Sequence, residues 1–365
     1  MDRKIGGRIK QRIEDFQVEE IPKTKENTEN DATIFWMKKF NWDTNKALGF
    51  IAKSLHVSTK RLGVAGTKDK RAVTRQRVSV WNIPKERLQK IKLKDIELYD
   101  FSSGDRLNLG DLEGNKFVIT IRDINLKREE LEPLLKEKIT KLKKGIPNYF
   151  GPQRFGDVRP ITHLVGMEML KGNFKEAVKI YTARVFPKEP DDAKEARNFL
   201  EKNWNKQGFL KSIKKFPKRL NYERTMIDYL YNYPRDYAGA LRRLPKRLRK
   251  MFLNAVQAYV WNEVAKKEDL KKEKMSLVSY DSKNLDPETR KLLKKIDIRP
   301  NMFLMRSMPE LKCSGGERKL LLKPKNLKII EISKDEFNEG KLKATISFTL
   351  PSGSYATVIL KEIME

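Results

Sequence analysis

A single carboxylate lies among several cations in the segment Ala65–Gln76. The carboxylate is Asp69, and its basic neighbours are Lys68, Lys70, Arg71 and Arg75. A cationic surround favours the charged form of a carboxylate and attracts polyanions, so this segment could hold a reactive aspartate against an anionic substrate. Structural charge clusters are more common than catalytic ones, and a solvated turn rich in Lys and Asp is the alternative. The segment alone leaves both interpretations open.

Short apolar stretches flank this segment on both sides. Leu62–Ala65 precedes it and Arg77–Trp81 follows it, and both have the composition of strands. We therefore expect Asp69 to lie in a loop between two strands, at the rim of a sheet. Functional residues are often carried on such loops because the sheet beneath provides a rigid base.

The other residue types exclude several kinds of active site. The chain has two histidines, His56 and His163, far apart in sequence, and one cysteine, Cys313. We expect neither a zinc site nor a Ser–His–Asp or Cys–His centre from them. The sequence also lacks a phosphate-binding loop and a dinucleotide fingerprint. An enzyme built here works with carboxylates and cations, and isomerisation of a bound substrate fits because it needs no second reactant.

The overall charge predicts a polyanionic partner. The 365 residues, a length typical of two domains, include 79 Lys and Arg against 49 Asp and Glu, a net charge of +30. With one cysteine no intrachain disulfide can form, the N-terminus lacks the apolar stretch of a signal peptide, and no apolar run approaches a membrane span. We expect a cytoplasmic protein without a membrane segment.

Basic residues are concentrated between Lys206 and Lys250. This stretch holds fourteen Lys and Arg against three acids, with seven aromatic residues among them. Cations that neutralise phosphates and rings that stack on bases are the combination used on unpaired or irregular RNA. The alternative is a helical core whose rings face inward and whose lysines face water. We favour that alternative for the rings and RNA binding for the net charge.

The periodicity changes twice along the chain. Strand patterns at Ala32–Met37 and Phe117–Ile121 alternate with helical ones, one capped by Asp43 and another, from Leu131 to Leu142, ending at Gly145. Helical patterns dominate from about 157 to 317. Strand patterns then return at Leu327–Ile332, Ala344–Leu350 and Tyr355–Leu360, and the last two flank a hairpin signal at Pro351–Ser354. This order predicts one sheet domain, 1–156 and 318–365, interrupted by an inserted helical domain, 157–317.

Three further segments join the Asp69 segment. They are Lys10 with Glu14–Glu20, Asn148–Gly156 and Phe348–Thr357. In this order the four segments resemble the TruD family of RNA pseudouridine synthases over nearly the whole chain, and Gln257–Asn262 is a weaker match. The resemblance implies an α+β fold: a synthase domain with a mixed or antiparallel sheet, a largely helical inserted TruD domain, and a V-shaped cleft between them.

The resemblance also implies roles for individual residues. Asp69 matches the essential catalytic aspartate, and Lys10 matches a basic residue of the same cleft. The residues that would contact or stack on the target base are Phe16, Asn148, Phe150 and Phe348. The basic residues expected to bind RNA are Lys68, Lys70, Arg71, Arg75 and Arg154. Without the resemblance, Phe16 and Phe348 would be taken for core rings. No metal, cofactor or protein partner is implied, and the oligomeric state is open.

The implied reaction converts uridine to pseudouridine, with the uridine at position thirteen of tRNA as the expected target. Positive charge develops at the sugar as the glycosidic bond loosens, and a nearby carboxylate stabilises or captures it. Asp69 could act as a nucleophile at C1′ or as a base towards a sugar proton. Two other functions remain open: a basic protein that binds or remodels RNA without chemistry, and a glycosylase that releases the base.

Overall fold

The computed structural model describes residues 3–23, 30–268 and 273–365. The chain forms two compact units, the first from residues 1–146 and 322–365 and the second from Pro147–Leu321. The sequence pattern predicts domain boundaries at 156/157 and 317/318. In the structure, the short segments 147–156 and 318–321 belong to the second unit instead. In the described ranges, no helix is long and apolar enough to cross a membrane.

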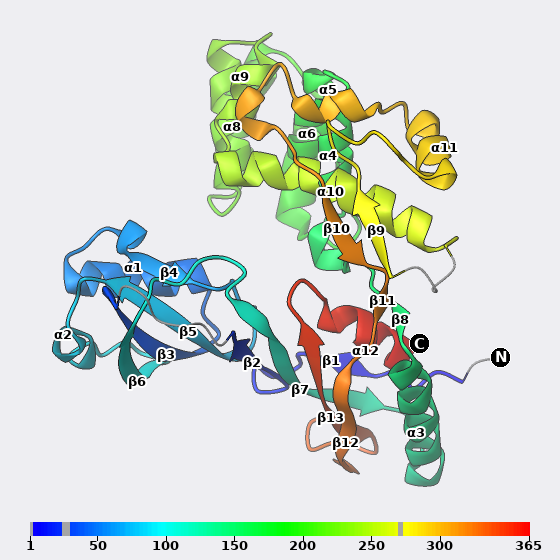
Figure 1. Cartoon of the computed structure of the whole chain (residues 1–365). Helices are drawn as coiled ribbons and strands as arrows, with labels where there is room; N and C mark the ends of the chain where they lie inside the picture. Colours follow the sequence, from blue (N-terminus) through cyan, green and yellow to red (C-terminus); the bar gives the residue numbers. More distant parts are fainter. Residues whose placement is uncertain (1–2, 24–29, 269–272) are drawn as a thin grey trace. The chain divides into compact units, whose positions relative to one another are not determined.

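The first unit is built on a mixed sheet that contains nine strands of the described chain (Figure 1). Their order is β12-β13-β7-β2-β5-β3-β6, with β1 paired to β7 and β4 paired to β5. β2 and β5 run parallel, whereas the other pairings are antiparallel. The strands are β1 (Arg8–Ile9), β2 (Phe16–Pro22), β3 (Ala32–Phe40), β4 (Leu62–Val64), β5 (Val73–Trp81), β6 (Ile96–Gly104), β7 (Leu112–Ile124), β12 (Lys325–Lys334) and β13 (Leu342–Pro351).

Helices of the first unit follow local sequence signals. They are α1 (Thr44–Leu55), α2 (Lys85–Gln89), α3 (Arg128–Lys144) and α12 (Ala356–Met364). The Asp43 side chain accepts a hydrogen bond from the amide of Lys46, which caps α1 as expected. Gly145, with a φ of 106°, follows α3 and ends it as expected. The buried face of α1, made of Ala47, Leu48, Ile51, Ala52 and Leu55, packs in one cluster with residues of β3 and β5.

One expected strand is a helix. Tyr355–Leu360 was expected to pair with the preceding strand, but α12 begins at Ala356 and packs against α3 (Figure 1). The β-branched residues Thr357, Val358 and Ile359 fit a strand, but Ile359, Leu360 and Ile363 also fall on one helical face, and all three are buried. Over so short a segment both structures fit, and packing against α3 decides between them.

The second unit is largely helical. Its helices are α4 (Thr162–Leu170), α5 (Phe174–Thr182), α6 (Asp191–Lys202), α7 (Lys206–Lys215), α8 (Asn221–Asn232), α9 (Tyr237–Arg242), α10 (Lys246–Ala265) and α11 (Pro287–Lys295). β9 (Lys274–Leu277) and β10 (Gly316–Lys319) form an antiparallel pair. The division between the two units falls within β8 (Ile146–Pro147) and β11 (Leu321–Leu322), which pair with each other. The core contains Trp261, Phe252 and Phe209, all at most 2% exposed.

Candidate active site

Asp69 lies in the loop between β4 and β5, as the flanking strands predict. Its side chain is 33% exposed, and Lys10 Nζ lies 3.4 Å from Asp69 Oδ2. The same ammonium lies 4.0 Å from the centre of the Phe16 ring. The structure therefore brings three of the expected site residues, Lys10, Phe16 and Asp69, into one cluster. In this cluster an accessible carboxylate faces a cation that rests on an aromatic ring.

Buried polar side chains fix the main chain of the Asp69 loop. Gln76 Nε2 donates to the carbonyl oxygen of Gly66 over 3.0 Å, and Thr44 Oγ1 accepts from the amide of Lys68 over 3.1 Å. Lys39 Nζ donates to the carbonyl oxygen of Asp69 itself over 2.8 Å. Gln76 and Thr44 are fully buried, and Lys39 is 1% exposed. Because these donors and acceptors come from β5, α1 and β3, the loop geometry is set by the packed core.

The basic residues around Asp69 differ in availability. Lys68 Nζ lies 2.6 Å from Glu20 Oε2, and these side chains are only 5% and 1% exposed. The ammonium of Lys68 is thus buried in an ion pair that ties the loop to β2, which does not suit the phosphate contact expected of it. Arg75 donates to the Tyr99 hydroxyl, and this hydrogen bond raises the pKa of Arg75. Lys70 and Arg71 are exposed.

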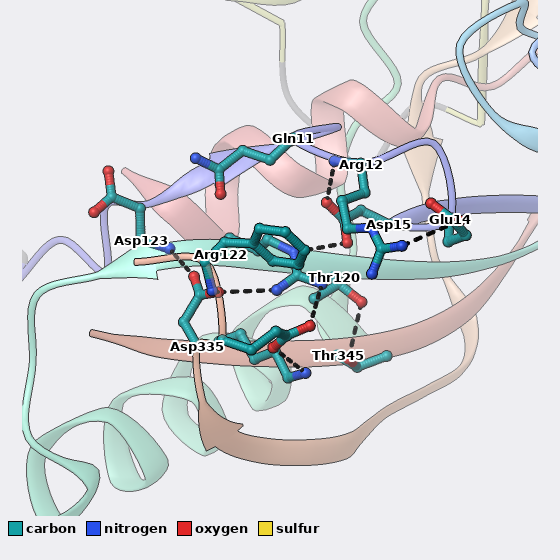
Figure 2. A network of polar contacts seen from close by, with 12 residues as sticks. Gln11, Arg12, Glu14, Asp15, Thr120, Arg122, Asp123, Asp335 and Thr345 are labelled. Carbon is teal, nitrogen blue, oxygen red and sulfur yellow. Dashed lines mark hydrogen bonds and ion pairs between the residues drawn. The ribbon is translucent and has the colours of Figure 1, made fainter. Parts of the chain in front are cut away.

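A second network anchors the segment that carries Lys10. Figure 2 shows Arg122 between Asp15 and Asp335, with Nε–Oδ1 and Nη1–Oδ1 distances of 2.8 and 2.9 Å. Asp15 Oδ2 also accepts from the amide of Arg12 over 2.7 Å, which closes the turn after Lys10. Lys10 has a φ of 57°, an uncommon left-handed conformation for a residue with a side chain. Such a conformation persists where its surroundings determine it, and the Asp15–Arg122 pair provides that support.

Burial and hydrogen bonding act in opposite directions on the acids around Arg122. Burial by itself raises the pKa of Asp335, but hydrogen bonds from the Asp123 amide, Asn338 and Arg122 more than offset it, and its pKa lies below the usual value. Hydrogen bonds from Arg122 and Lys343 lower the pKa of Glu336 to about 2. Both carboxylates are therefore ionised at neutral pH.

Two of the expected base-contacting rings are packed in the interior. Phe16 is 1% exposed, Phe348 is fully buried, and both contact Phe117 at centroid distances of 6.3 and 5.3 Å. A fully buried ring has no face to offer a base. The structure thus supports the core interpretation of Phe348, and Phe16 serves as the surface on which Lys10 rests.

The remaining site residues form a group of their own in the second unit. Arg318 Nε donates to the carbonyl oxygen of Asn148 over 2.8 Å, and its guanidinium lies 4.0 Å from the centre of the Phe150 ring. Asn262 Oδ1 accepts from the Phe150 amide over 2.8 Å, and Asn262 Nδ2 donates to the Phe150 carbonyl over 2.9 Å. The Arg154 guanidinium lies 5.4 Å from the same ring. Phe150 is therefore fixed through its main chain and through contacts at its ring.

The supporting residues that were not identified from the sequence include Lys39, Asn262 and Arg318. Lys38–Lys39 was taken as the polar boundary of a strand, but β3 continues to Phe40. Because side chains alternate between the two faces of a strand, Lys39 lies on the same face as Phe35 and Met37, which are both fully buried. This alternation could have indicated from the sequence that Lys39 is buried. Asn262 lies in the weaker match Gln257–Asn262, whereas Arg318 had no local signal.

Comparisons with known proteins cover the whole chain. The sequence profile of the family described as tRNA pseudouridine synthase D (TruD) matches residues 2–278 and 275–363. A relative from Methanococcoides burtonii named for tRNA pseudouridine synthase D is 36% identical, over 99% of this chain and 93% of its own length. A relative of the same name from Pyrococcus abyssi is 32% identical, over 98% and 96%.

A solved crystal structure agrees with the sequence relatives. It comes from Methanosarcina mazei and is named for tRNA pseudouridine synthase D. It is 35% identical to this chain, covers all of it and 94% of its own length, and superposes with a TM-score of 0.77. This similarity confirms the expected α+β class, a mixed sheet combined with a largely helical unit. On the combined evidence of profile, relatives and structure, the chain belongs to the tRNA pseudouridine synthase D family.

Proposed function

We propose that the chain isomerises uridine to pseudouridine in tRNA, at position thirteen, with Asp69 as the catalytic group. The observation that carries this proposal is the Asp69 carboxylate, partly accessible, paired with Lys10 and held on a loop whose main chain is fixed by buried side chains. A fixed carboxylate stabilises developing positive charge well because it needs no reorganisation during the reaction. Family membership supplies the substrate class.

The reaction breaks the N1–C1′ bond, rotates the uracil while it stays bound, and forms a C5–C1′ bond. The proton from C5 is then lost to solvent and N1 takes up a proton, so the product is an isomer of the starting nucleoside. Asp69 stabilises the cationic sugar, either by attack at C1′ or by removing a sugar proton. Lys10, 3.4 Å from that carboxylate, offsets the negative charge of the detached uracil. Phe150 contacts the base, and stacking on an aromatic ring contributes about 1–3 kcal/mol. Asn148 is left out of this role because it is 5% exposed and its side-chain amide is bound to Arg318 and Lys319.

RNA binding is assigned to exposed cations. Lys70 and Arg71 lie in the catalytic loop beside Asp69 and are exposed. Arg75, in β5 after the same loop, and Arg154, near Phe150 in the second unit, are part-exposed. Lys68 is left out of this set because its ammonium is committed to Glu20. We expect log Kd for tRNA to rise linearly with log salt concentration, because each neutralised phosphate releases counterions. We infer a cytoplasmic location from this substrate class.

The test compares Asp69→Asn with the wild-type protein. Transcribed tRNA labelled with tritium at uridine C5 releases tritium as the carbon–carbon bond forms. We expect Asp69→Asn to bind tRNA with an unchanged Kd and to release no tritium above background. Asp123→Asn is the control, because Asp123 pairs with the exposed Arg8 at the surface and is expected to leave the rate unchanged.

Three outcomes would contradict the proposal. Undiminished product from Asp69→Asn would remove the catalytic role of this residue. Tight tRNA binding without product from the wild-type protein would favour an RNA-binding protein without chemistry. Free uracil and an abasic site would indicate a glycosylase. Mapping pseudouridine along the tRNA then tests the assignment to position thirteen.

A further inference from the structure

We propose that Lys39 is the positioning residue of the catalytic loop, holding the main chain of Asp69 so that the carboxylate is presented in one orientation. This inference rests on the catalytic role proposed for Asp69. Lys39 belongs to β3, where it lies opposite Thr74 of β5, and the neighbouring Lys38 lies opposite Arg75. Successive side chains of a strand point to opposite faces. Lys38 is accordingly exposed, whereas Lys39 points into the interior and is 1% exposed.

The buried ammonium bridges two main-chain segments. Lys39 Nζ donates to the carbonyl oxygen of Trp42 over 2.7 Å and to that of Asp69 over 2.8 Å. Trp42 immediately precedes the Asp43 cap of α1. One side chain thus ties the start of α1 to the centre of the catalytic loop. Fixing the carbonyl of Asp69 restricts the peptide plane from which the reactive side chain projects.

Other contacts hold the loop beside Asp69, and Lys39 holds Asp69 itself. Gln76 binds Gly66, Thr44 binds the amide of Lys68, and Glu20 binds the Lys68 ammonium. These contacts hold the part of the loop that precedes Asp69. The main-chain carbonyl oxygen of Asp69 accepts its hydrogen bond from Lys39 Nζ. Without it, the loop would keep its fold but the reactive residue would gain freedom.

A buried lysine is an unfavourable choice for packing alone. Removing an ammonium from water costs free energy unless charge and hydrogen bonds compensate it. Burial lowers the pKa of Lys39 and is the largest influence on it. Asp69 and Asp43 raise this pKa, Lys68 lowers it further, and the resulting value is about 8. A methionine of similar length would fill the same space on a face shared with Phe35 and Met37 without that cost. The lysine is therefore explained by what its ammonium binds.

The experiment compares Lys39→Met with Lys38→Met, a matched pair of adjacent lysines on opposite faces of one strand. Lys38 pairs with Glu97 at the surface, with half of its side chain exposed. Single-turnover formation of pseudouridine, the Kd for tRNA and the thermal midpoint are measured for both variants, with Asp69→Asn alongside. A misplacement of about 1 Å at a reacting group can lower a rate by about 100-fold.

We expect Lys39→Met to lower the single-turnover rate per folded molecule about 10- to 100-fold, with Kd within twofold of the wild type. Lys38→Met is expected to change the rate by less than twofold. Faster amide exchange in the 66–72 peptide of Lys39→Met, and not of Lys38→Met, would locate the effect in the loop. A purely structural lysine would instead lower the thermal midpoint and leave the rate per folded molecule unchanged.

Two results would overturn the inference. One is a Lys39→Met rate within twofold of the wild type, and the other is a loss of rate that follows a loss of folded protein. If Lys39→Met does not fold, the comparison is repeated with Lys39→Gln, which retains a hydrogen-bond donor. A third result would then overturn the inference: a wild-type rate in folded Lys39→Gln whose 66–72 peptide has lost its protection from amide exchange. An active Asp69→Asn would refute the proposed function instead, so the two failures are distinguishable.

Discussion

Replacing Arg122 by methionine should destabilise the first unit strongly, because it removes the buried cation that Asp15 and Asp335 share in the network of Figure 2. The guanidinium side chain is 5% exposed and pairs with Asp15, Asp335 and Glu336 at 2.8, 2.9 and 3.1 Å. Asp15 and Asp335 are 2% and 0% exposed, so they would be left as buried carboxylates. Glu336 is 46% exposed and would be solvated by water.

The magnitude follows from the two buried partners. Removing one member of a buried ion pair costs about 3–5 kcal/mol, whereas an exposed pair contributes about 0–1 kcal/mol. We therefore expect Arg122→Met to lower the free energy of unfolding of the first unit by about 3–5 kcal/mol at pH 7, with little of this from Glu336. Arg8→Met is the control, because Arg8 is 70% exposed and pairs with Asp123, so its cost should be about 0–1 kcal/mol.

The difference between the proteins should depend on pH in a defined direction. The folded-state pKa of Asp335 is lowered, so its contribution is present above its unfolded value of 3.8 and is lost as the pH falls through the lower, folded value. Removal of Arg122 takes away one of the hydrogen bonds that lower this pKa. The gap between wild type and variant should therefore be largest above about pH 5 and should shrink in acid.

Hydrogen exchange read by mass spectrometry separates the two units, because peptides of β7 and β13 report on the first unit alone. Exchange is followed at several urea concentrations, at pH 7 and at a pH below 3.8, where the contribution of Asp335 is being lost. The 10–15 segment should also lose protection in Arg122→Met, since Asp15 anchors the turn after Lys10. A loss below 1 kcal/mol, or an equal loss at both pH values, would refute this account of the network.

Two further predictions concern the second unit. Asn262→Ala removes both hydrogen bonds on the Phe150 main chain, and we expect a slower single-turnover rate with unchanged exchange in the Asp69 loop; an unchanged rate would show that Phe150 needs no such support. Burial raises the pKa of Cys313 to about 11, so iodoacetamide at pH 8 should not label the native protein and should label it in urea. Rapid labelling of the native chain would contradict this.

Local signals in the sequence predicted those elements that are stabilised locally. Asp43 marks the start of α1, and α6 begins directly after Pro190 within the stretch where helical patterns were expected to dominate. α12 was missed because its short apolar pattern satisfies both a strand and a helix. The Asp69 loop was placed correctly between two strands, since its charged residues interrupt an apolar pattern on both sides.

The residues that support the site depend on contacts between distant segments. Arg318 reaches Asn148 across 170 positions, and Lys39 reaches Asp69 across 30. A sequence shows each of these as one basic residue among 79. Lys68 and Lys70 likewise look equivalent beside Asp69, yet one is buried against Glu20 and the other is exposed.

The amino-acid sequence by itself determined the charge, the segment that carries the proposed catalytic carboxylate, the family resemblance and most of the helices, because each of these is a property of residue type or of short-range order. Tertiary structure alone decided which cations are free to meet a polyanion and which are used to hold the loop. The physical reason is that burial and hydrogen-bond partners give identical side chains different roles, and both depend on which distant strands and helices pack together.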